Sequence, residues 1–82
     1  MEVEIFGIEK VDYTKKDGTH VSGYNINYGT PIDEKFGEGF RVTREYVAAS
    51  RVQGDLQVGY KALVTFGRGF DGQAYLSGVQ AL

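Results

Sequence analysis

Residues 21–29 read VSGYNINYG, and this stretch decides the fold class. Its large apolar side chains, Tyr24, Ile26 and Tyr28, occupy every second position, and glycine or asparagine fills the positions between them. An alternation of period two is typical of a β-strand with one buried face, whereas a helix would repeat about every 3.6 residues. The stretch therefore predicts a strand whose two tyrosines and isoleucine face the core.

A turn and a second alternating stretch precede this strand. Residues 14–20 read TKKDGTH, and Asp17-Gly18 favours a hairpin turn because glycine tolerates positive φ. Residues 2–13, EVEIFGIEKVDY, also alternate, with a change of phase at Phe6-Gly7-Ile8 that indicates a β-bulge. We therefore predict a long hairpin over residues 2–29.

Residues 39–47 form the third predicted strand. Arg44 falls on its apolar phase, so the strand is expected to bulge or to leave the core there. EYVAAS, residues 45–50, is long enough for only one helical turn. The side chains expected to face the core are Phe40, Val42 and Tyr46, and those expected on the opposite face are Asn25, Asn27, Arg41, Thr43 and Glu45.

Two more strands are predicted after a short connector. Residues 56–66, LQVGYKALVTF, and residues 73–81, QAYLSGVQA, both alternate, and the GRGFDG turn joins them. The side chains of the first of these strands that are expected to face inward are Val58, Tyr60, Ala62, Val64 and Phe66.

The fold class is therefore expected to be all-β, with five strands and a short helical turn between strands 3 and 4. Five short strands with a glycine kink in the first describe a small OB-like barrel, here a single domain over residues 1–82. A five-stranded SH3-like barrel is the nearest alternative.

Composition limits the possible functions. The 82 residues include no cysteine, and the formal net charge is −2, which argues against a protein that grips duplex DNA by charge alone. MEVEIFGIEK, residues 1–10, lacks the basic start and apolar run of a signal peptide. No apolar run is long enough to span a membrane. We expect a cytoplasmic protein that does not enter membranes.

Catalytic chemistry finds little support in the sequence. His20 is the only histidine, and no serine stands in a fixed relation to it. No metal-ligand spacing and no phosphate-binding glycine loop occur. We therefore expect a protein that is not an enzyme and needs no metal or cofactor.

Binding of single-stranded nucleic acid finds more support, because it needs cations for the phosphates and flat rings for the bases. In an OB barrel, the strand 1–2 and strand 4–5 loops flank the binding face. Each of these loops joins basic and aromatic residues here. The candidate nucleic-acid-binding residues are Tyr13, Lys15, Lys16, Asn25, Arg41, Arg68 and Phe70.

Simpler roles exist for several of these residues. Lysines in a turn keep a hairpin soluble and discourage edge pairing. Phe66 and Phe40 fit core positions better than ligand contacts, whereas Phe36 and Phe70 fit either role. A protein–protein interaction module, or a phage structural module, on the same small barrel is therefore the alternative function.

Three features together suggest a family. The first hairpin is tipped by Lys15-Lys16-Asp17-Gly18, a charged third strand leads into a brief connector, and Val58-Gly59-Tyr60 leads to FGRGFDG at residues 66–72. This layout resembles the small OB-fold single-stranded-DNA-binding proteins of filamentous phages. The resemblance implies sequence-tolerant coating of single-stranded DNA by a dimer, in DNA replication. It also implies phosphate contacts from Lys15, Lys16, Arg41 and Arg68, and stacking by Tyr13 and Phe70.

Overall fold

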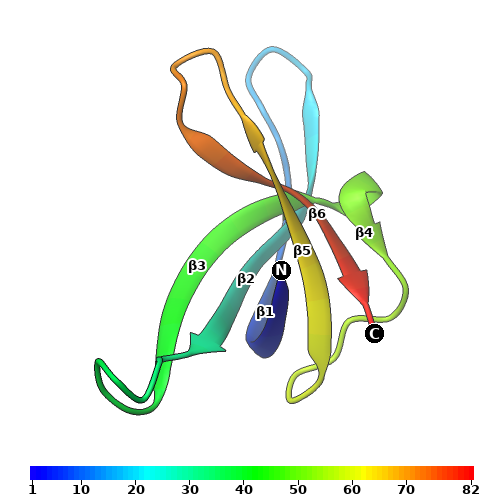
Figure 1. The fold of residues 1–82 in the computed structure, drawn as a ribbon. Coiled ribbons are helices and arrows are strands. Elements are labelled where there is room, and N and C mark those ends of the chain that lie inside the picture. Colours follow the sequence, from blue (N-terminus) through cyan, green and yellow to red (C-terminus); the bar gives the residue numbers. More distant parts are fainter.

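The computed structural model describes residues 1–82 and shows an all-β protein (Figure 1). No helix in it has the length and apolar character needed to cross a bilayer. The strands are β1 (Glu2–Thr14), β2 (His20–Pro31), β3 (Phe40–Ala48), β4 (Val52–Gln53), β5 (Lys61–Arg68) and β6 (Ala74–Ala81). The expected helical turn is a single 3-10 turn, η1 (Ala49–Arg51), between β3 and β4.

The strands form one sheet in the order β3-β2-β1-β5-β6-β4. All neighbouring pairs are antiparallel except β4 and β6, which run parallel. The predicted count of five strands is therefore wrong. The sixth strand is the two-residue β4, which sequence alternation cannot reveal because it is too short to show a period.

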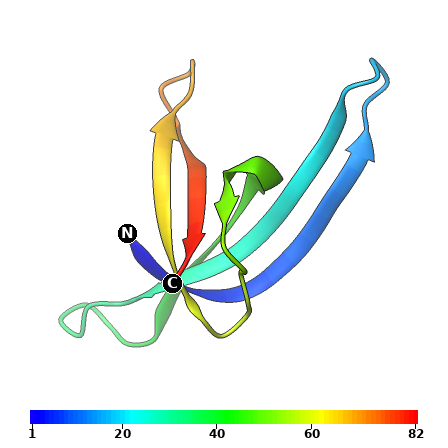
Figure 2. The same cartoon turned by 90° about the vertical axis from the view of Figure 1, so that its right-hand side faces the viewer.

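The bulge predicted in the first strand is confirmed. Ile5 pairs with Tyr28 and Gly7 pairs with Asn27, so Phe6 is the extra residue of β1. The strand bends strongly there and leads into a long arm formed with β2 (Figure 2). A second shift of register follows Thr65, which pairs with Gly78 while Phe66 pairs with Leu76.

The sheet curls but does not close into the predicted barrel. β3 and β6 approach each other, yet no backbone ladder joins them. The core lies inside the curl and consists of Val3, Ile5, Ile26, Tyr28, Val47, Ala62, Val64, Leu76 and Val79. A groove, described below, separates β3 from the first half of β6, where a closed barrel would have hydrogen bonds.

The predicted orientation of β3 is wrong. Val47 is 1% exposed and pairs with Tyr24, whereas Val42 is 58% exposed. Side chains directly opposite each other share one face, so Thr43 and Glu45 lie on the core-facing side. Apolar residues occupy both faces of this strand. The alternation of apolar and polar residues therefore could not show which face is buried. The side chains that lie outside instead of inside are Phe40, Val42 and Tyr46.

The inward positions expected over residues 56–66 are also partly wrong. β5 begins only at Lys61, so Val58 and Tyr60 belong to the preceding loop and are exposed. Ala62 and Val64 are buried as expected. Phe66 is 44% exposed because the β5–β6 hairpin extends beyond the core at that point.

Candidate nucleic-acid interface

Two hairpin arms project from the same end of the molecule (Figure 1). One is the β1–β2 hairpin and the other is the β5–β6 hairpin. A view turned by 90° shows the arms splayed apart, with the 3-10 turn lying between them (Figure 2). The two loop tips therefore lie at one end of the molecule, as the interface hypothesis requires.

The β1–β2 tip presents two lysines without ion-pair partners. Lys15 and Lys16 are exposed, and neither belongs to a salt bridge of the structure. Their acidic neighbour Asp17 is engaged by its own turn, because its Oδ1 accepts a hydrogen bond of 2.9 Å from the Thr19 amide. That hydrogen bond lowers the pKa of Asp17. The turn thus occupies the carboxylate and leaves the ammonium groups facing solvent.

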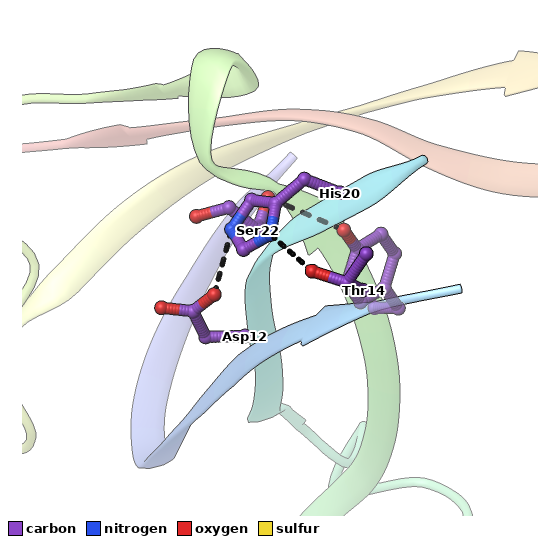
Figure 3. Close-up of polar contacts among 5 residues, drawn as sticks. Asp12, Thr14, His20 and Ser22 are labelled. Atoms are coloured by element: carbon purple, nitrogen blue, oxygen red, sulfur yellow. Dashed lines mark hydrogen bonds and ion pairs between the residues drawn. The ribbon is translucent and has the colours of Figure 1, made fainter. Parts of the chain in front are cut away.

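A line of polar contacts lies along the arm below this tip (Figure 3). Nε2 of His20 lies 2.7 Å from Oδ1 of Asp12, and Nδ1 lies 3.2 Å from the Thr14 hydroxyl. This set was not predicted from the sequence. It forms because Thr14 pairs with His20 and Asp12 pairs with Ser22, which brings all four to one face. The imidazole and the carboxylate are each about half exposed, so we assign this line to bracing the arm.

The β5–β6 tip presents an arginine and a free ring. Arg68 donates a hydrogen bond of 2.8 Å to the Gly72 carbonyl, so its guanidinium is fixed over the turn. Asp71 accepts a hydrogen bond from the Gln73 amide at 3.0 Å. The Phe70 side chain is fully exposed and covers no other residue of the core. This tip therefore pairs one cation with one ring open to solvent.

Two tyrosines that were not predicted as site residues lie across glycines of neighbouring strands. Tyr46 of β3 lies across Gly23 of β2, where an added Cβ would stand 2.5 Å from its hydroxyl oxygen. Its hydroxyl donates a hydrogen bond of 3.3 Å to the Ser22 carbonyl. Tyr75 of β6 lies in the same way across Gly67 of β5. The two glycines were the missed signal, since a glycine in a strand marks a place where a neighbouring ring can lie on the backbone.

A groove of about 560 Å³ runs between β3 and the first half of β6, which β4 does not pair with. Its lining residues are Glu45, Tyr46, Ala48, Arg51, Ala74, Tyr75, Leu76 and Ser77. Leu76 is buried and Glu45 lies on the core-facing side of β3, so these two form its inner side. Tyr75 also lines a second hollow, with Arg68 and Phe70, at the β5–β6 tip.

The structure brings most of the predicted site residues to this end, with one exception. Tyr13 and Asn25 lie on the outer face of the β1–β2 arm, and Asn25 pairs with Tyr46. Arg41 lies at the start of β3, beside the β2–β3 loop, and shares the core-facing side with Thr30. It is therefore far along the strand from the tips, and only Arg51 places a cation in the groove.

Charge is divided unevenly between the two ends of the molecule. The loops opposite the tips, residues 32–39 and 54–60, hold one cation, Lys35. Their acids are Asp33, Glu34, Glu38 and Asp55. Although the net charge is −2, the tip end is therefore the less acidic end.

No protein-family model, curated protein or solved structure matches the chain. The family resemblance expected from the sequence therefore stays a prediction, and function is inferred from the geometry of the tip end.

Proposed function

We propose that this protein binds single-stranded DNA without strong sequence dependence and has no catalytic activity. One observation carries the proposal: two arms tipped by Lys15, Lys16 and Arg68 flank a groove lined by two half-exposed tyrosines. Single strands are held by cations that follow the phosphates and by rings on which bases stack. Both parts are present at one end of the molecule.

In this proposal the cations and the rings have separate tasks. Lys15, Lys16 and Arg68 contact phosphates, and the flat rings of Tyr46 and Tyr75 receive bases. Stacking is worth about 1–3 kcal/mol per base, and it tolerates any sequence because every base has a π-face. Tyr13 and Phe70 extend the stacking surface toward the two tips.

The sheet supports an OB-like fold for this role. Its order is β3-β2-β1-β5-β6-β4, and it curls without closing, with η1 after β3. The loops that flank the binding face of OB barrels correspond to the two arms. We propose that the protein coats single-stranded DNA as a dimer, the role that the resemblance to phage proteins implies. An exposed apolar patch of Phe6, Phe40 and Val42 is available for contact between copies.

The proposal is tested by titrating a labelled single-stranded oligonucleotide of mixed sequence at low and at moderate salt. Binding through phosphates requires the affinity to fall as salt rises. Arg68→Ala is expected to weaken binding, whereas Lys35→Ala, at the opposite end, is expected to leave it unchanged. Absence of binding at low salt would refute the proposal.

The same Phe6–Phe40 patch favours the second candidate, a protein–protein interaction module. The rings meet edge to face, with centroids 5.4 Å apart, and remain 38% and 46% exposed. If Phe40→Ser abolished association with protein partners while oligonucleotides never bound, this second function would replace the first.

A further inference from the structure

Arg51 carries a positive charge that no acidic residue of the protein pairs with. It is the last residue of η1, its side chain is exposed, and it belongs to no salt bridge of the structure. Its main chain is nevertheless fixed, because η1 contacts β2 and β6 and the Arg51 carbonyl oxygen lies 3.6 Å from the place of a Cβ added to Gly78. The protein therefore presents an unpaired guanidinium from an anchored turn.

The turn that carries Arg51 lies between the two arms (Figure 2). Arg51 lines the groove together with Tyr46 of β3 and Tyr75 of β6, and it is the only cation among the lining residues. A base stacked on either ring carries its phosphates with it, and these phosphates need a cation near the ring. Arg51 is placed to supply that cation.

The one acidic residue of the groove leaves this guanidinium free. Glu45 also lines the groove, but its Oε2 is buried and no ion pair joins the carboxylate to Arg51. The carboxylate interacts with the core instead. Burial, the charge of Glu45 and a hydrogen bond with Glu45 together raise the pKa of the buried Tyr28 hydroxyl to about 12.

We propose that a bound strand passes through the groove, between Tyr46 and Tyr75, and that Arg51 holds one of its phosphates there. This inference rests on the proposed function, and it adds the path of the strand to it. A guanidinium can bind a phosphate through two parallel hydrogen bonds. Arg41, the residue of β3 that the sequence suggested for a phosphate contact, lies at the far end of the strand and takes no part.

The experiment compares Arg51→Gln with Arg41→Gln, using an oligo-dT probe over a series of salt concentrations. The two arginines are a matched pair, since both are exposed and neither belongs to a salt bridge. Arg51→Gln should lose about 0.7 of the slope of log affinity against log salt. Its affinity at 0.1 M salt should fall about fivefold, the factor that this slope gives between 0.1 M and 1 M. Arg41→Gln should change neither quantity.

Arg51→Lys separates a phosphate contact from a structural role. Lysine keeps the charge, so this variant should retain the slope that Arg51→Gln loses. An unaltered slope in Arg51→Gln, or an equal loss in Arg51→Lys and Arg51→Gln, would overturn the inference and leave the proposed function standing. A loss in Arg41→Gln alone would also overturn it, because the strand would then run along the other end of β3. No binding by the unmodified protein at low salt would overturn both.

Discussion

Tyr75 lies across Gly67 of the neighbouring strand, where an added Cβ would stand 2.8 Å from both Cζ and the hydroxyl oxygen of the ring. The ring is 52% exposed, so one of its sides is held by the sheet and the other is open to solvent. If bases stack on this ring as proposed, the ring is already in place, and binding does not need to order it.

Gly67→Ala is expected to displace the Tyr75 ring and weaken oligonucleotide binding by about 1 kcal/mol, the lower range for one stacked base. The contact is with the far end of a side chain, so the fold is expected to survive. Gly37→Ala, which meets only Ile32 at 3.5 Å, is the control. Fluorescence anisotropy measures the affinity, and an unchanged value would show that Tyr75 does not receive a base.

Lys15→Gln combined with Lys16→Gln is expected to reduce the salt dependence of binding. Each phosphate contact to a single strand contributes a slope of about 0.7 in log affinity against log salt, so the double variant should lose about 1.4. Lys35→Gln, in the β2–β3 loop, should lose nothing. An unaltered slope in the double variant would remove the β1–β2 tip from the interface.

Val47→Ala and Val42→Ala test the orientation of β3 with the same chemical change. Val47 is 1% exposed, and its truncation should lower the free energy of unfolding by about 2 kcal/mol. Val42 is 58% exposed, and its truncation should change that free energy by about 0.5 kcal/mol or less. Urea unfolding measures both, and the reverse order would mean that the strand faces the other way.

The protein is expected to lose stability in alkaline solution because of Tyr28. Burial, and next the charge of Glu45, raises the pKa of its hydroxyl from 10.0 to about 12. As pH rises, the Tyr28 hydroxyl loses its proton in the unfolded chain before it does so in the folded protein. The free energy of unfolding is therefore unaffected below pH 10 and falls between about pH 10 and 12. The slope reaches at most about 1.4 kcal/mol per pH unit. Tyr28→Phe should remove this slope, whereas Tyr60→Phe, in an exposed loop, should retain it.

Asp12→Asn should loosen the β1–β2 arm without unfolding the protein. The carboxylate lies 2.7 Å from Nε2 of His20 in an exposed position, so its loss should cost about 1 kcal/mol or less. Hydrogen exchange should become faster at the amides of Lys15 and Gly18, which bond within the tip. Glu9→Gln, which breaks only the pair with Arg44, should not affect those amides.

The sequence predicts the long hairpin and its bulge because Tyr24, Ile26 and Tyr28 alternate with small or polar residues, and Gly7 interrupts the first strand. It fails on β3, where Phe40, Val42 and Tyr46 compete with Val47 for the buried side. The deciding information is non-local: Tyr46 covers Gly23 of another strand, and this can be seen only once the register is known.

The candidate site was predictable to a similar degree. The tips could be predicted from the sequence, since Lys15, Lys16 and Arg68 lie beside turn glycines. The groove could not be predicted, because Glu45 and Tyr75 are 30 residues apart in the sequence and line one groove only when β3 approaches β6. This part of the site could not be predicted because its residues are far apart in the sequence, although their chemistry suits a binding site.

The acidic loops at the far end have a consequence for a strand covered by many copies. With the tips turned toward the nucleic acid, Asp33, Glu34, Glu38 and Asp55 would form the outer layer of the covered strand. Neighbouring filaments would then repel each other through like charge at low ionic strength and would stay dispersed instead of bundling.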